Sequence, residues 1–305
     1  MKATRESYGD ALVELGAKYE KLVVLDADLA NATKTQGFKK AFPEKFFDMG
    51  IAEQDMIGTA AGLSIGGKIP FASTFAVFAT GRAYDQIRAE VAYPNLNVKI
   101  AGTHAGVTVG EDGATHQALE DIALMRSMPN MTIISPADDV ATHALVEEAI
   151  KYNGPVYVRL ARPATADVYD ANTKFEFGKA IQHGDGTDAT IIATGVTVCE
   201  ALKAKEELAK ENINVRVIDM HTIKPIDKDI IIKAAKETKK IFTVEDHSVI
   251  GGLGTAVADV LCECCPAQLV KLGVNDEFGK SGKWNELLAY YGLDAEHIKE
   301  KIRNV

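Results

Sequence analysis

Short runs of Val, Ile, Leu and Phe alternate along the chain with longer segments of helical periodicity. Such runs are typical of parallel strands that are buried on both faces, and the longer segments are typical of helices that cover them. In the first half, the pattern predicts strands at 22–25, 46–48, 69–73, 98–103, 132–135 and 156–160. Predicted helices lie between them, at 4–19, 53–65, 77–92, 119–126 and 138–151. This alternation favours an α/β fold with a mainly parallel, doubly wound sheet.

Between Arg162 and Asp188 the pattern lapses into Pro, Thr, Asp and Gly, with one strand-like piece at 175–181. We interpret this stretch as a linker between domains. A second α/β unit follows, with predicted strands at 190–194, 215–218, 241–244 and 269–272 and predicted helices at 196–211, 229–236 and 255–264. We therefore predict two doubly wound domains, residues 1–165 and 188–305, joined by a linker over 166–187.

Composition narrows the class of protein. The chain has 305 residues, of which 47% are hydrophobic and 25% charged, as in ordinary globular proteins. A formal net charge of -9 is the opposite of what a nucleic-acid-binding surface needs, so a small substrate is favoured. No stretch reaches the roughly 18 apolar residues of a membrane span, and the charged start lacks the apolar core of a signal peptide. We expect a cytoplasmic protein.

The four cysteines are Cys199, Cys262, Cys264 and Cys265. Their spacing fits neither a zinc site nor a disulfide framework, so we expect buried or half-buried thiols in a reducing compartment.

Three glycine motifs look like phosphate or metal sites. Residues 62–68, GLSIGGK, match most of a phosphate-binding loop, but here the helix precedes the strand. Residues 184–186, with Asn212, mimic a Gly-Asp-Gly motif that holds Mg²⁺ and diphosphate, yet they precede a predicted strand instead of following one. We interpret them as a plain turn. Residues 251–254, GGLG, follow a strand and open a helix, which leaves a minor anion-binding role open.

Polar residues gather in four segments that follow predicted strands of the first unit, where an α/β sheet presents its functional loops. The segments are LDADLANAT, DMGIAEQDM, STFAVFATG and THAGVTVGEDGATHQALED. In the second segment, Glu53 opens a helix of small apolar residues; by itself it would be typical of a surface carboxylate stabilised by the helix dipole. In the third, Phe75 and Phe78 lie three apart and so share one face of a helix or tight turn.

In the fourth segment, His104, Asp112 and His116 fall within thirteen residues. Three glycines, at positions 106, 110 and 113, separate them. Glycine at this density indicates a tight loop that approaches other backbone closely.

Together these segments resemble transketolase, and specifically the half of it that carries the pyrimidine-binding and C-terminal domains. The most specific match is VGEDGATHQ at 109–117, followed by MGIAEQDM at 49–56 and ADL at 27–29. The resemblance runs from Arg5 to the end of the chain and does not include the diphosphate-binding half. It therefore implies the C-terminal subunit of a split transketolase, which moves a two-carbon ketol unit from a ketose phosphate to an aldose phosphate. The implied partner is a separate N-terminal subunit, in a two-plus-two heterotetramer.

The resemblance also implies the cofactors thiamine diphosphate and Mg²⁺, with the metal and the diphosphate held mainly by the partner. It assigns Glu53 to the hydrogen bond with the ring nitrogen N1′ of the aminopyrimidine, in a dry and apolar setting. Phe75 and Phe78 match the aromatic wall that stacks on the pyrimidine. Asp28 and Leu29 match the segment beside the thiazolium and the substrate channel.

For the substrate, His116 and Asp112 match family residues that hydrogen-bond hydroxyls near the reacting carbons, and His116 joins Glu53 as an expected catalytic residue. Arg5, His104 and Arg162 match the cationic group around the substrate phosphate, for which the planar fork of arginine is well suited. The chain departs from the family after Phe78. Gly81 stands where some relatives have an aromatic residue, and one residue is inserted before Arg82.

Two kinds of alternative stay open. Within the same cofactor group, the chain could correspond to part of a 1-deoxyxylulose-5-phosphate synthase or to the β subunit of a 2-oxoacid dehydrogenase. His104 and the loop at 109–117 favour transketolase over both. A non-catalytic regulatory subunit is the alternative from another class, and the presence of Glu53, Phe75 and Phe78 argues against it.

Overall fold

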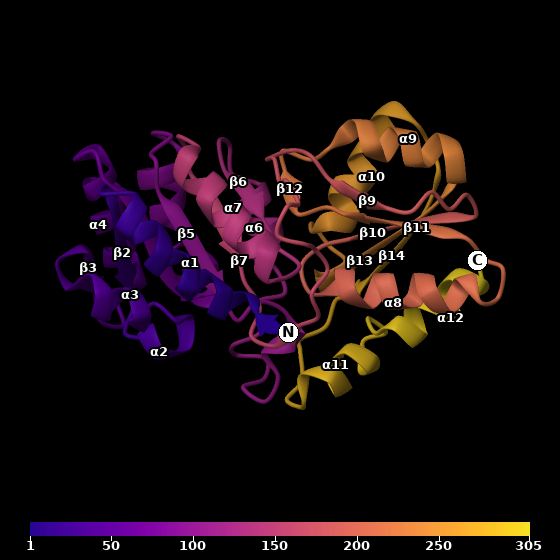
Figure 1. Cartoon of the computed structure of the whole chain (residues 1–305), viewed down its shortest axis with the longest axis horizontal. Helices are drawn as coiled ribbons and strands as arrows, with labels where there is room; N and C mark the ends of the chain where they lie inside the picture. The colour runs from indigo at the N-terminus through magenta and orange to yellow at the C-terminus, as the bar shows by residue number, and fades with distance from the viewer.

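The computed structural model describes all 305 residues as two α/β units that lie side by side (Figure 1). The first unit is built on a seven-stranded sheet of order β12-β6-β7-β5-β4-β2-β3, in which every pair is parallel except β12 with β6. Its strands are β2 (Leu22–Asp26), β3 (Phe46–Asp48), β4 (Ile69–Phe75), β5 (Lys99–Thr103), β6 (Thr132–Ile134), β7 (Val156–Arg159) and β12 (Thr222–Lys224). The α/β class predicted from the sequence is confirmed.

Helices cover both faces of this sheet because successive side chains of a buried strand point to opposite faces. Val24 packs in the core beside α1 and α7, whereas its neighbour Leu25 packs in the core beside α4 and α6. Outside residues 78–92, the helical elements of the first unit are α1 (Thr4–Lys18), α2 (Ala30–Thr33), α3 (Gln36–Ala41), η1 (Pro43–Lys45), α4 (Glu53–Ile65), η4 (Val107–Val109), α6 (Asp121–Arg126) and α7 (Asp139–Lys151).

The predicted helix over 77–92 is not a single α-helix. It consists of two π-helical turns, η2 (Phe78–Arg82) and η3 (Ile87–Ala92), on either side of the short α5 (Tyr84–Gln86). A π-helical turn is the usual way for a helix to take in one extra residue without shifting the residues that follow. The position just before Arg82, where the family resemblance implies an inserted residue, lies in η2.

The second unit is a five-stranded sheet of order β14-β13-β10-β11-β9, in which only β9 is antiparallel to its neighbour. Helices α8 and α12 cover one face, and α9 and α10 cover the other (Figure 1). The elements are β9 (Ile181–His183), β10 (Ala189–Ala193), α8 (Thr197–Ala209), β11 (Val215–Asp219), α9 (Lys228–Thr238), β13 (Lys240–Ser248), α10 (Leu253–Cys264), β14 (Gln268–Val274), α11 (Trp284–Tyr290) and α12 (Ala295–Arg303). The sequence pattern did not predict β9, β12, α2, α3, α11 or α12.

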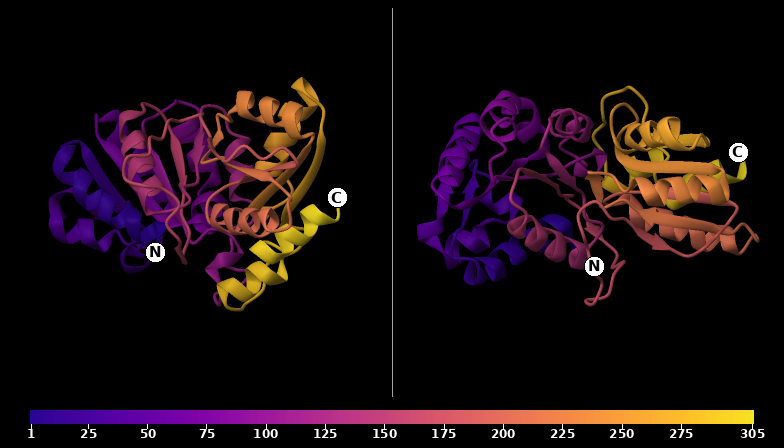
Figure 2. Two further views of the ribbon diagram at one scale, coloured as in Figure 1. Left: turned by 45° about the vertical axis from the view of Figure 1, so that its right-hand side comes forward. Right: turned by 90° about the horizontal axis from the view of Figure 1, so that it is seen from above.

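Several features join the two units. Strand β12 comes from the second half of the chain but pairs with β6 of the first sheet. The pairing of β1 (Lys2–Ala3) with β8 (Ala164–Thr165), by contrast, lies within the first unit. One hydrophobic core of 43 buried residues continues from the α1 and α7 face to the α8 face. In the views of Figure 2, the N-terminus lies near the junction of the units, and the C-terminus lies at the far end of the second.

The segment predicted as a linker is held by two aspartates that also cap helices. Asp138 accepts from the amide of Ala141 at the start of α7, and its other oxygen accepts from the amides of Val168 and Tyr169. Asp227 does the same at α9, where it accepts from the amides of Ile230 and Ala180. A carboxylate at a helix start satisfies amides that otherwise have no partner, so each cap also fixes one part of this segment.

A buried ion pair lies where the units meet. Arg159, on β7, donates to Asp121 at 2.7 and 3.1 Å and to the carbonyl oxygen of Asp246, on β13, at 2.8 Å. Tyr157 also donates to Asp121, at 2.8 Å. Burial alone would raise the pKa of the Asp121 carboxyl, but the charge and hydrogen bonds of Arg159, with His247 and Tyr157 beside it, hold that pKa below its ordinary value.

We predict that Asp121→Asn lowers the free energy of unfolding by about 3 kcal/mol at pH 7, because Arg159 then stays buried without its carboxylate. A carboxyl with a lowered pKa stabilises the fold above its unfolded pKa of about 4, and this contribution is lost as the pH falls further. Urea unfolding of both proteins at pH 7 and near pH 3 should therefore show a smaller difference in acid.

The matched control is Asp259→Asn, which breaks the exposed pair between Asp259 and Arg126 and should cost less than about 1 kcal/mol. An equal loss for Asp121→Asn at both pH values would contradict the prediction.

Candidate functional site

Glu53 is the first residue of α4, just beyond the carboxyl end of β3. Its side chain is only 1% exposed, and both of its oxygens accept from Nη1 of Arg82 at 2.8 Å. The setting is dry, as predicted, but it is not purely apolar. Sequence reasoning missed Arg82 because it lies 29 residues along the chain, in η2, and reaches Glu53 only through the fold.

The two phenylalanines form a wall beside this carboxylate. The rings of Phe75 and Phe78 are nearly parallel, with an angle of 9° and centroids 5.8 Å apart. The guanidinium of Arg82 stacks over Phe78, 4.5 Å from its centroid. Arg82 therefore joins Glu53 to the aromatic wall, while its own side chain is 46% exposed.

His104 continues the wall on the side of Phe75. It follows β5, its backbone is left-handed at φ 57°, and its ring stacks on Phe75 with centroids 3.9 Å apart. Arg5 Nη1 lies 3.1 Å from Nε2 of His104. Because a guanidinium can only donate, Nε2 accepts, and Nδ1 carries the proton that it donates to Thr103 at 2.9 Å. His104 is therefore held as the neutral Nδ1–H tautomer.

The electrostatics of His104 agree with this hydrogen bonding. Burial is the largest cause that lowers its pKa, and the cations Arg5 and Arg162 lower it further, to about 3. The ring thus stays neutral over the physiological range and can accept a hydrogen bond without adding a positive charge.

Arg5 also ties the 26–35 segment to the site. Its Nη1 donates to the carbonyl oxygen of Ala32 at 3.0 Å, while its buried Nε has no hydrogen-bond partner. The segment itself is organised by Asp26, which accepts from the amide of Leu29 and from the hydroxyls of Thr33 and Thr35. Burial raises the pKa of Asp26 to about 6. Sequence reasoning passed over Asp26, although it ends a buried strand and lies in the LDADLANAT segment.

His116 lies edge-on to both phenylalanines, with centroids 6.2 Å from Phe75 and 5.5 Å from Phe78. Nη1 of Arg162 lies 3.8 Å from Oδ1 of Asp112. Arg162 also donates to the carbonyl oxygen of Val109. His116 thus brings the loop to both phenylalanines, while His104, with Arg5 beside it, stacks on Phe75.

Asp28 and Leu29 are set apart from this group. They line a separate surface pocket of about 240 Å³, together with Lys39 and Asp48. Asp28 is exposed and has a left-handed backbone at φ 61°. The structure therefore brings Glu53, Phe75, Phe78, His104, His116 and Arg5 into one chain of contacts, with Arg162 and Asp112 next to them.

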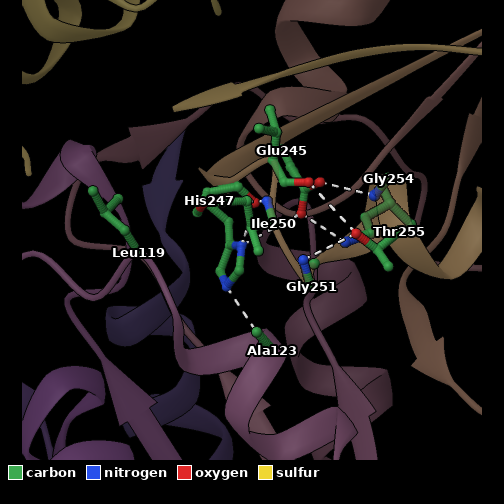
Figure 3. Close-up of polar contacts among 12 residues, drawn as sticks. Leu119, Ala123, Glu245, His247, Ile250, Gly251, Gly254 and Thr255 are labelled. Carbon is green, nitrogen blue, oxygen red and sulfur yellow. Dashed lines mark hydrogen bonds and ion pairs between the residues drawn. The ribbon is translucent and has the colours of Figure 1, made fainter. Parts of the chain in front are cut away.

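The glycine motifs are structural. Residues 62–68 run from the end of α4 into β4, so no helix start faces them. Asp185 accepts from Gln182 in the connection between β9 and β10, so it precedes a strand as predicted. At residues 251–254, the amides of Leu253 and Gly254 already bond to the carboxylate of Glu245, so the helix start is filled by the protein itself (Figure 3).

No group of three or more His, Cys, Asp or Glu side chains is arranged to hold a metal ion. No helix has the length and apolar character needed to cross a bilayer. Cys199 is buried and Cys265 half-buried, but Cys262 and Cys264 are exposed, contrary to expectation, because they lie on the outer side of α10.

The chain is similar to known proteins over its whole length. Residues 1–167 match the family model of the transketolase pyrimidine-binding domain, and residues 178–298 match that of the transketolase C-terminal domain. A protein of Methanocaldococcus jannaschii named as a transketolase C-terminal section is 54% identical, over 99% of this chain and 95% of that protein.

Human transketolase is 42% identical over 99% of this chain, but the chain spans only 49% of it. The solved structure of a split-gene transketolase, described as an inactive β4 tetramer, is 52% identical and has a TM-score of 0.93. The match covers 100% of this chain and 98% of that one.

We predict that the ring of His104 does not titrate between pH 5 and pH 8. Its pKa of about 3 is held down by burial and by neighbouring cations, so NMR signals of the ring carbons should stay constant over this range. In Arg5→Leu, which removes one of those cations, the pKa of His104 should move upward. A titration of His104 in the unsubstituted protein near pH 6.5 would contradict the assignment.

Proposed function

The chain belongs to the transketolase family, and we propose that it is the subunit of a split transketolase that holds the pyrimidine side of the active site. In this proposal the complete enzyme transfers a two-carbon ketol unit from a ketose phosphate to an aldose phosphate. The observation that carries the proposal is the carboxylate of Glu53, which is 1% exposed and joined through Arg82 to a parallel pair of phenylalanine rings.

These residues fit the pyrimidine end of thiamine diphosphate. When bound, this cofactor supplies the nucleophilic carbon that carries the ketol unit. One oxygen of Glu53 can keep its hydrogen bond from Arg82. The other can share a proton with the ring nitrogen N1′, which is itself an acceptor, so the hydrogen bond needs that proton between the two atoms. The buried position of Glu53 keeps water away from that bond, and a hydrogen bond to a buried carboxylate is stronger than one in water. Phe75 and Phe78 provide a flat apolar surface for a heterocycle.

The loop residues fit a phosphorylated sugar. We assign His116 and Asp112 to hydroxyl groups near the reacting carbons, where His116 can accept or return a proton. Arg5 and Arg162 are assigned to the phosphate, and the unpartnered Nε of Arg5 is a donor that such an anion would satisfy. His104 accepts from Arg5 and so orients the guanidinium. Asp28 and Leu29 are assigned to the thiazolium side of the cofactor.

We assign the diphosphate and Mg²⁺ to an N-terminal partner subunit. The split-gene relative was solved as an inactive β4 tetramer, which supports the proposal that this chain needs a partner for activity. Human transketolase is about twice as long as the matched region, in keeping with a second half on another polypeptide. Two copies of each subunit, with symmetry-related sites, are the proposed assembly in the cytoplasm.

We predict that Glu53→Gln lowers kcat of the assembled enzyme by at least about 100-fold, because proton management typically contributes that much. The assay is the transfer of a ketol unit from xylulose 5-phosphate to ribose 5-phosphate. The matched control is Asp55→Asn, which removes an exposed carboxylate from the same helix turn and should keep the rate. Size-exclusion chromatography confirms that both variants assemble. A rate for Glu53→Gln within a few-fold of the unsubstituted enzyme would overturn the assigned role.

A further inference from the structure

Residues 104–117, here called the substrate segment, contact the second unit through a buried carboxylate. Asp246 lies on β13 and is 1% exposed. One of its oxygens accepts from the amide of Val107 at 2.7 Å. The other accepts from the amide of Thr108 at 3.2 Å and from the hydroxyl of Thr108 at 2.6 Å. Three hydrogen bonds to one charged group form a strong and directional anchor.

The glycines of the substrate segment are explained by the same contact. Gly106 has φ 79°, and a Cβ atom there would come within 2.1 Å of the Asp246 carboxylate. Gly113 has φ 74°, and a Cβ atom there would lie 2.4 Å from the hydroxyl of Ser281. Both glycines therefore allow the segment to lie directly against the second unit, in conformations that other residues rarely adopt.

Gln117 completes the attachment at the end of the segment. Its Nε2 lies within hydrogen-bond distance of the carbonyl oxygens of Val107, Gly110 and Lys280, at 3.2, 3.4 and 2.9 Å. Two of these carbonyls belong to the segment, and the third belongs to the second unit. The side chain thus closes the segment on itself and ties it to the second unit.

The two residues bonded to Asp246 lie, in sequence, between residues that we assign to the substrate-binding site. Val107 and Thr108 stand between His104 and Asp112 in sequence, and Arg162 donates to the carbonyl oxygen of the next residue, Val109. We propose that Asp246 is a positioning residue for ketol transfer, and that the second unit serves to hold the substrate segment in its binding geometry. This inference rests on the proposed function, because that function gives the substrate segment its role.

The neighbouring residue Glu245 provides a matched control. It is fully buried on the same strand, and it also accepts two backbone hydrogen bonds. Its partners are the amides of Leu253 and Gly254 at the start of α10 (Figure 3). Asp246→Asn and Glu245→Gln therefore each replace a buried carboxyl on the same strand, but only Asp246 is bonded to residues of the segment.

We predict that Asp246→Asn raises KM for the sugar phosphates about ten-fold in the assembled enzyme and leaves kcat within about two-fold, because the loss of one charge-assisted hydrogen bond is of this size. Glu245→Gln should leave KM unchanged even though it lowers the thermal midpoint. Hydrogen–deuterium exchange of peptides covering 104–117 should become faster in Asp246→Asn and should not change in Glu245→Gln.

A second pair of variants tests the same contact by changing Thr108, the partner of Asp246 in the substrate segment. Thr108→Val removes the hydroxyl that bonds Asp246 and should raise KM as Asp246→Asn does. Thr108→Ser keeps this hydroxyl, so its KM should equal that of the unsubstituted enzyme. Equal KM values and equal exchange of residues 104–117 in the Asp246 and Glu245 variants would overturn the inference. An inactive unsubstituted complex would instead refute the proposed function, and the exchange measurement would still decide whether Asp246 holds the segment.

Discussion

In a parallel sheet, all strands end at the same edge, and this constraint determines where chemistry can occur in the first unit. Glu53 follows β3, Phe75 ends β4 and His104 follows β5, so three segments distant in sequence meet at one edge. Phe75 and His104 are fixed by the buried strands β4 and β5, and Glu53 is fixed by the start of α4. The Glu53 carboxylate, the phenylalanine rings and the neutral imidazole of His104 are therefore held in fixed positions relative to one another.

The second unit contacts the loops at this edge of the first sheet. Arg159 donates across the junction to the carbonyl oxygen of Asp246, and the Asp246 carboxylate receives the backbone of Val107 and Thr108. The residues proposed to recognise the sugar therefore depend on a carboxylate from the other sheet. This dependence explains why a loop rich in glycine can be ordered: its flexible positions are those at which it touches the second unit.

Local pattern was sufficient to predict most of the strands and the start of α4, because buried runs and helical periodicity are properties of neighbouring residues. It could not place Arg82 against Glu53 or Asp246 against Val107, since these partners are separated by 29 and 139 residues. The π-helical turn at η2 was missed for a related reason. An inserted residue changes helix geometry without changing the hydrophobic pattern, and only the packing around it decides which form it takes.

The central claim is that this chain holds one half of an active site. The most direct test measures ketol transfer with thiamine diphosphate and Mg²⁺ for this chain alone, for an N-terminal subunit alone and for their equimolar mixture. The account predicts activity only in the mixture. Transfer by this chain alone at a rate comparable to that of the mixture would contradict it, as would a mixture that forms a stable complex, binds the cofactor and transfers no ketol unit.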